Sequence, residues 1–204
     1  MDREQFLQGP NESDSAFAKR IRLTKEVAQN PQKLGLQDVQ VGKFHLPWLL
    51  YKVSNKKLPP WEAAATWIIE HEGVKIPLLQ VRKRYAENEE IWNHELVHIM
   101  RIAFDEPRFE EIIAFDQSKS RFRKWLGPFF RTPKESLVFL LVVIGSTIVG
   151  VFTPLAFFLP VVVFSIFCIR LFRDLRIFSR CKKKSSYESI LRMSDKEILQ
   201  MVSN

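Results

Sequence analysis

The sequence predicts an α+β protein in which a small, mainly helical domain with a short β-hairpin precedes a C-terminal transmembrane helical hairpin. Residues 136–169 contain no charged side chain, two strand-like segments surround Gly73, and several upstream segments carry apolar residues at helical spacing. We expect the domain over residues 1–120, the membrane anchor over residues 121–180, and a basic, amphipathic cytoplasmic tail over residues 181–204.

The net charge of +8 is unevenly distributed. Residues 118–135 carry +5 and residues 170–184 carry +6, so the rest of the chain is −3. The two basic segments flank the charge-free run, which is typical of cytoplasmic flanks of a membrane anchor rather than of a nucleic-acid-binding surface. The first residues lack an apolar stretch typical of a secretory signal, so we expect residues 1–135 to stay on the cytoplasmic side.

The charge-free run is too long for one straight span. Its 34 residues would form a helix of about 51 Å, against a hydrocarbon thickness of about 30 Å. Gly150, Thr153 and Pro154 favour a turn in the middle, which predicts two short spans at about 137–150 and 155–170. A single kinked span is the alternative, but basic flanks on both sides favour an even number of crossings.

Upstream of the anchor, the pattern predicts both helices and strands. Ala65–Glu70 and Val74–Arg82 are expected to form a β-hairpin, whereas Leu34–Pro60 is expected to be rich in loops. Helices are expected at residues 14–29, 87–104 and 108–118, and a short last helix after the capping box of Ser194 and Glu197.

The segment His94-Glu95-Leu96-Val97-His98 carries the strongest chemical signal. Side chains four residues apart lie on one face of a helix, so both imidazoles can reach the same ion, for which Zn²⁺ is suited. Glu95 would then act as a general base on the attacking water and return the proton to the leaving amine. The alternative is a surface helix with two solvated histidines. The other histidines, His45 and His71, are expected to be ordinary polar residues.

These five residues resemble the zincin metallopeptidases. The metzincin branch requires glycine and histidine three and six residues after the second histidine, where this chain has Arg101 and Phe104. Charged residues on both sides of the motif argue against a helix inside lipid. The remaining resemblance, over residues 85–116, is to the gluzincins, which implies a zinc site completed by a glutamate from a following helix.

Glu110 and Glu111 are the candidates for this third ligand. The resemblance favours Glu111, because Ala114 follows it three residues later as in gluzincin ligand motifs, although Phe115 stands where those motifs have aspartate. The apolar pattern of the helix instead favours Glu110. We prefer Glu111 and keep both, with Asp116 as a weaker candidate for a ligand or a partner of a ligand histidine. Otherwise both glutamates simply stabilise a helix N-terminus.

The expected function is therefore that of a zinc-dependent, membrane-anchored metallopeptidase with a protein or peptide substrate, a lipid bilayer as partner and both termini in the cytoplasm. The resemblance implies that the strand Val74–Arg82 binds extended substrate by edge pairing, and Tyr85 and His71 are candidates for stabilising the oxyanion. Two other classes stay open: a catalytically inactive membrane adaptor, with or without zinc, and a zinc hydrolase that acts on something other than peptides.

Overall fold

The computed structural model describes residues 6–43, 46–60 and 62–203, and His45 lies outside them. The chain divides into two compact units, Met1–Asp105 and Glu106–Asn204. This boundary lies about one helix earlier than the expected domain end at residue 120. The helix that carries Glu110 and Glu111 therefore belongs to the same unit as the expected membrane anchor.

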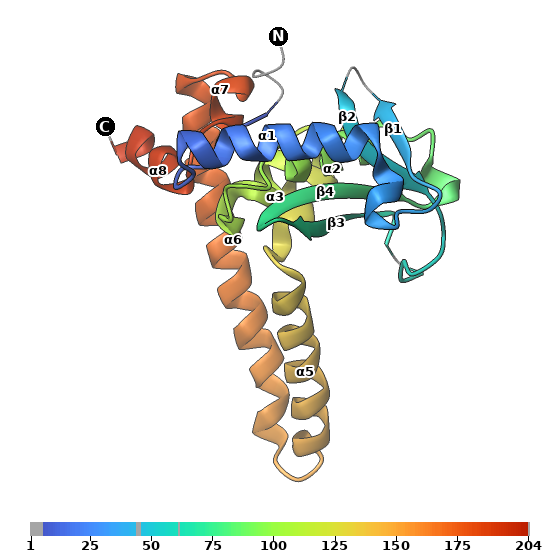
Figure 1. The fold of residues 1–204 in the computed structure, drawn as a ribbon. Coiled ribbons are helices and arrows are strands. Elements are labelled where there is room, and N and C mark those ends of the chain that lie inside the picture. The colour runs from blue at the N-terminus through green and yellow to red at the C-terminus, as the bar shows by residue number, and fades with distance from the viewer. Residues whose placement is uncertain (1–5, 44–45, 61, 204) are drawn as a thin grey trace. The chain divides into compact units, whose positions relative to one another are not determined.

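The first unit is built on a four-stranded mixed sheet (Figure 1). The strand order is β1 (Gln40–Lys43), β2 (Leu46–Val53), β4 (Val74–Val81) and β3 (Ala64–His71). The pairs β1–β2 and β3–β4 are antiparallel, and β2 pairs in parallel with β4. A mixture of sheet and helices agrees with the α+β class expected from the sequence.

The expected hairpin is confirmed as β3 and β4, with Glu72 and Gly73 forming the turn. Their φ angles are +51° and +72°. Two successive residues with positive φ make a type I′ turn, whose twist suits the two flanking strands and in which glycine is favoured. The local pattern was therefore sufficient to place this pair of strands.

The expectation that Leu34–Pro60 is rich in loops missed two strands, because β1 and β2 lie within this segment. The side chains of Trp48, Leu49 and Leu50 are all buried, so β2 lacks the alternating pattern of a half-exposed strand. Its parallel partner β4 is distant in the chain, with Leu50 opposite Leu78. The expected hairpin of β3 and β4 therefore accounts for only two of the four strands.

Two helices pack on this sheet. Helix α1 (Asp14–Gln29) has the bounds expected from the sequence, contacts β2 and β4, and crosses in front of the sheet in Figure 1. Helix α2 (Glu89–Met100) contacts β3 and β4. It ends four residues before the expected end at Phe104, where the chain continues as turns. The single-turn helices η2 (Pro31–Leu34) and η3 (Lys83–Tyr85) lie in the connections.

Because helices and loops cover both faces of β4, both sets of its alternating side chains contribute to the core. Ile76 and Leu78 on one set of positions are buried, and so are Leu79 and Val81 on the other. The core of this unit is completed by apolar side chains from the other elements: Phe6, Leu23, Val27, Trp48, Leu49, Leu50, Trp92 and Ile99.

A nearly buried ion pair attaches the segment before α1 to that helix. Arg20, only 5% exposed, donates from Nε and Nη2 to the two carboxylate oxygens of Glu12 at 2.7 and 2.8 Å, and from Nη2 to the carbonyl of Leu7. Burial alone would raise the pKa of Glu12, but hydrogen bonds from Arg20 and from the Gly9 N–H outweigh it and hold the pKa below its usual value.

We expect Glu12→Gln to lower the free energy of unfolding by about 2 kcal/mol at neutral pH, because the buried Arg20 loses its charged acceptor. The folded-state pKa of Glu12 lies below the reference value of 4.5. The difference in unfolding free energy between the wild type and Glu12→Gln should therefore be full above pH 4.5, and it should decline as the pH falls through the folded-state pKa. Thermal unfolding of the full chain in detergent at several pH values would measure this.

Glu26→Gln is the matched control, because Glu26 and Lys33 form a longer ion pair of 3.8 Å between exposed side chains. It should change stability little at any pH. Equal effects of the two substitutions would contradict the role assigned to Glu12.

The second unit is helical. It contains α3 (Pro107–Asp116), the helical hairpin α5 (Pro133–Gly150) and α6 (Leu159–Lys184), and the last helix α8 (Asp195–Ser203). Its shorter helices are α4 (Arg121–Leu126), η4 (Gly127–Phe129), η5 (Pro154–Phe158) and α7 (Tyr187–Leu191). The expected capping box is confirmed: the Ser194 N–H donates to Glu197 Oε2 at 2.7 Å, and the Glu197 N–H donates to Ser194 Oγ at 3.2 Å.

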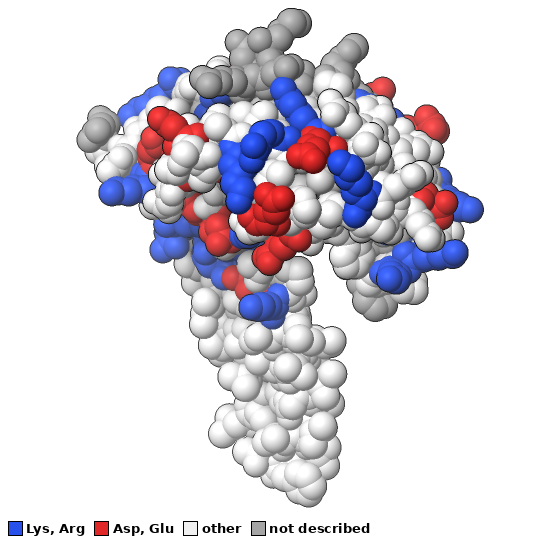
Figure 2. Space-filling view, in the orientation of Figure 1, with Lys and Arg blue, Asp and Glu red and all other residues white. Residues whose placement is uncertain are grey.

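Helices α5 and α6 lie side by side and are joined through η5 (Figure 1). Both are long and apolar enough to cross a membrane, and most of their large apolar side chains are exposed. Figure 2 shows no charged side chain on the hairpin beyond its base. The Phe157 ring lies so close to Gly150 that a Cβ there would come within 2.7 Å of it, so the close turn requires glycine. The chain thus forms a helical hairpin rather than one kinked helix.

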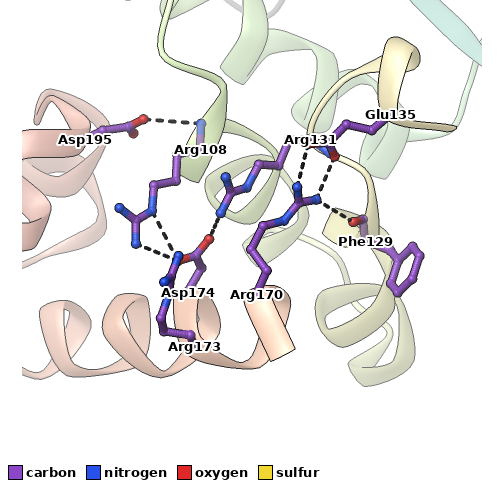
Figure 3. A network of polar contacts seen from close by, with 8 residues as sticks. All are labelled: Arg108, Phe129, Arg131, Glu135, Arg170, Arg173, Asp174 and Asp195. Carbon is purple, nitrogen blue, oxygen red and sulfur yellow. Dashed lines mark hydrogen bonds and ion pairs between the residues drawn. The ribbon is translucent and has the colours of Figure 1, made fainter. Parts of the chain in front are cut away.

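A network of charged side chains lies at the base of the hairpin (Figure 3). Asp174 on α6 is only 1% exposed and accepts hydrogen bonds from Arg108 Nε and Nη2, at 3.2 and 2.8 Å, and from Arg131 Nη2. Beside it, Arg170 forms a two-pronged ion pair with Glu135 on α5, at 2.6 and 2.7 Å. The network therefore joins α3, the segment before α5, and both helices of the hairpin.

We expect Asp174→Ala to destabilise the second unit by roughly 3 kcal/mol or more, because it leaves Arg108 and Arg131 without their shared counter-ion. Thermal unfolding of the full chain in detergent, followed by circular dichroism, would show the loss. Arg173→Gln is the control: its guanidinium lies 3.5 Å from Asp174 but its side chain is 61% exposed, so the change should be small. A wild-type midpoint for Asp174→Ala would contradict the structural role of the network.

Candidate metal centre

Helix α2 places His94 and His98 on one face, with their Nε2 atoms 3.3 Å apart. Two nitrogens bound to one tetrahedral zinc ion at about 2.0–2.1 Å would lie roughly 3.3–3.4 Å apart. The observed separation therefore suits two ligands of one ion. The same distance also suits a hydrogen bond between two neutral imidazoles.

Local sequence explains how α2 presents these side chains. The helix begins at Asn88, whose Oδ1 accepts hydrogen bonds from the N–H groups of Glu90 and Ile91. Trp92 is fully buried, and its indole N–H donates to the carbonyl of Ala86 at 2.8 Å. Trp92 fixes the rotation of the helix about its axis, because its ring packs edge-on against Tyr51 of β2.

Glu95 lies beside the first histidine and accepts a hydrogen bond from Thr66 of β3, with Oγ1 and Oε2 2.9 Å apart. Burial raises the pKa of Glu95 and the nearby charge of Glu62 adds to this, whereas His98 and the Thr66 hydroxyl oppose it. A carboxylate with a raised pKa and one fixed oxygen is suited to accept and release a proton.

Thr66 was missed in the sequence. It stands 29 residues before Glu95, and no local spacing connects a strand hydroxyl with a carboxylate on a later helix. Only the pairing of β3 with β4 and the packing of α2 against both strands bring the two side chains together.

The expectation that Val74–Arg82 is the edge strand is wrong. β4 lies between β2 and β3: it pairs with β3 over its whole length and with β2 from Leu78 to Val81. Among the described residues, β3 is the outer strand on this side of the sheet. It carries two exposed large apolar residues, Trp67 and Ile68, and it is also the strand that contacts Glu95.

His71 and Tyr85 stay candidates for stabilising the oxyanion, and the structure locates each of them. His71 ends β3 opposite Val74, five residues from Thr66, or roughly 16 Å along an extended strand. Tyr85 lies in η3 and packs against the apolar core. Neither observation places these side chains beside Glu95.

Glu110 and Glu111 are neighbours on α3 in the second unit, and both are half-buried. Besides the expected apolar face, Ala114 is also buried, with only 1% of its surface exposed. Since Ala114 lies one turn after Glu111, the helix is also covered on the side of Glu111. The burial pattern of α3 is therefore compatible with Glu111 as well as Glu110 as the third ligand.

Asp116 has a different role from the one considered in the sequence. Lys182 Nζ donates to both of its carboxylate oxygens at 2.8 Å, which attaches the end of α3 to α6. A carboxylate engaged in this way is a poor candidate for a metal ligand.

Searches of known proteins returned no matching family, no matching curated protein and no matching solved structure. The resemblance to gluzincins therefore depends on the motif residues themselves, and the geometry around them is the basis for a functional conclusion.

Proposed function

We propose that this chain is a zinc-dependent metallopeptidase anchored in a membrane by the α5–α6 hairpin. The observation that carries the proposal is the 3.3 Å separation of His94 Nε2 and His98 Nε2, with Glu95 held beside them by Thr66. If the two histidines were only polar surface residues, there would be no reason for Thr66 of β3 to hold the neighbouring Glu95 carboxylate.

The proposed ligands are His94, His98 and Glu111. Two imidazoles and one carboxylate are a donor set found in catalytic zinc sites, which keep one position open. Glu111 is preferred to Glu110 because of its spacing from Ala114, and because Glu111 and the two histidines form a group of potential metal ligands among the described residues. When bound, zinc would polarise the scissile carbonyl and lower the pKa of a water molecule.

Glu95 performs the proton transfers. Its carboxylate accepts a proton from the water that attacks the carbonyl carbon, and it delivers this proton to the nitrogen when the C–N bond breaks. The hydrogen bond from Thr66 holds one carboxylate oxygen in place and leaves the other oxygen for this role. The outer edge of β3 would bind the substrate backbone in extended form, with Trp67 and Ile68 contacting substrate side chains.

The hairpin would cross the bilayer twice. An 18-residue α5 is about 27 Å long, slightly less than a hydrocarbon core of about 30 Å, so basic residues at the base would extend towards the headgroups. Basic segments on both sides of the hairpin favour a cytoplasmic location for both flanks.

We expect the wild-type chain to carry close to one zinc ion, and His94→Ala or His98→Ala to lose it. Glu95→Gln should keep the metal, because Glu95 is not a ligand, but should reduce peptide hydrolysis about 100-fold or more. Metal analysis after purification and hydrolysis of a peptide library would test both parts. Metal-free wild-type chains would instead favour the membrane adaptor.

Glu111→Ala should weaken zinc binding by about 10-fold or more, because it removes a ligand and a negative charge from beside the ion. Glu110→Ala is the matched control on the same turn of α3 and should keep wild-type affinity. Competition with a chromophoric chelator measures both, and circular dichroism confirms that both fold. The reverse order would assign the ligand to Glu110, and equal wild-type affinities would exclude both glutamates.

Reporter fusions after Lys134 and after Lys184 should both be active in the cytoplasm, and a reporter inserted at Thr153 should report the opposite side. The reason is that an even number of crossings returns the chain to the side where it started. Opposite locations of the two flanks would contradict the hairpin topology.

A further inference from the structure

Helix α4 exposes three large apolar side chains: Phe122, Trp125 and Leu126 are 70%, 62% and 46% exposed. Their spacing of three and four residues places them on one face of the helix. Arg121 and Arg123 are exposed and flank this face, one on each side, whereas Lys124 lies on the opposite side of the helix. A short helix with this composition is unusual on a surface that contacts only water.

The apolar face of α4 lies next to helix α6 of the hairpin. The Trp125 ring packs edge-on against Phe172 of α6, with ring centroids 5.6 Å apart. Phe172 follows Arg170, the first charged residue after the charge-free run. The apolar face of α4 therefore continues the apolar surface of the hairpin at the level where charged residues begin. Tryptophan is enriched at this level of membrane proteins.

The basic side chains around α4 indicate what kind of surface this helix binds. Arg121 and Arg123 belong to the segment 118–135, with its net charge of +5, and the exposed Arg173 belongs to the segment 170–184, with +6. Basic side chains next to an apolar face that is continuous with a membrane span are complementary to anionic lipid headgroups.

We propose that α4 is a membrane-surface helix that binds an anionic bilayer. Phe122, Trp125 and Leu126 insert among the headgroups beside the hairpin, while Arg121 and Arg123 bind lipid phosphates. This rests on the membrane anchoring proposed above and adds a preference for anionic lipids. It also assigns residues 121–126 a lipid-binding role rather than that of a linker.

The test uses the full chain reconstituted in liposomes of phosphatidylcholine, with or without phosphatidylglycerol. The fluorescence of Trp125 is obtained as the difference between the wild type and Trp125→Phe. Lipids brominated near the headgroup should quench this signal more than lipids brominated at the chain end, and phosphatidylglycerol should increase the quenching about twofold. Arg121→Gln/Arg123→Gln should lose this dependence on phosphatidylglycerol.

Lys56→Gln/Lys57→Gln is the control, because it removes the same charge from an exposed loop of the first unit and should keep the dependence. Flotation after a carbonate wash reports insertion of the hairpin separately. If the chain floats but Trp125 is quenched by aqueous iodide and not by brominated lipid, the role of α4 is refuted while the anchor stands. If the chain does not float, both the anchor and the role of α4 are refuted.

Discussion

The second unit depends on the ion pairs that the buried carboxylate of Asp174 forms with Arg108 and Arg131. One negative charge, removed from water, binds arginines from α3 and from the segment before α5, and it lies on α6 itself. Buried charges are costly unless they are paired and hydrogen-bonded, so the partners must stay in place. Arg108 belongs to the helix that carries Glu110 and Glu111, and the position of α3 is thereby fixed to the base of the hairpin.

This has a consequence for the proposed enzyme. The proposed ligands His94 and His98 and the proposed general base Glu95 belong to the first unit, whereas the proposed ligand Glu111 belongs to the second. The position of Glu111 depends on α3, which the ion pair of Arg108 and Asp174 attaches to α6. Second-unit contacts that hold this helix would therefore also orient the carboxylate.

Several features could be predicted from sequence because they depend on neighbours along the chain. The bounds of α1, the turn at Gly73, the capping box of Ser194 and the break at Gly150 and Pro154 are examples. The facing of His94 and His98 follows from helical spacing alone. Strand β2 was missed since its partner lies far along the chain and both of its faces are covered, so no alternating pattern remains.

The sequence by itself determined the candidate metal motif, the apolar hairpin and the charges at its base, because spacing and composition define these features. Only the tertiary structure decided which strands are outermost in the sheet, which hydroxyl holds Glu95, and which residue neutralises Arg108 and Arg131. It also showed that Asp116 forms an ion pair with Lys182. These contacts join segments about 30 to 70 residues apart, and such pairs form through packing of whole elements, which leaves no mark in local sequence.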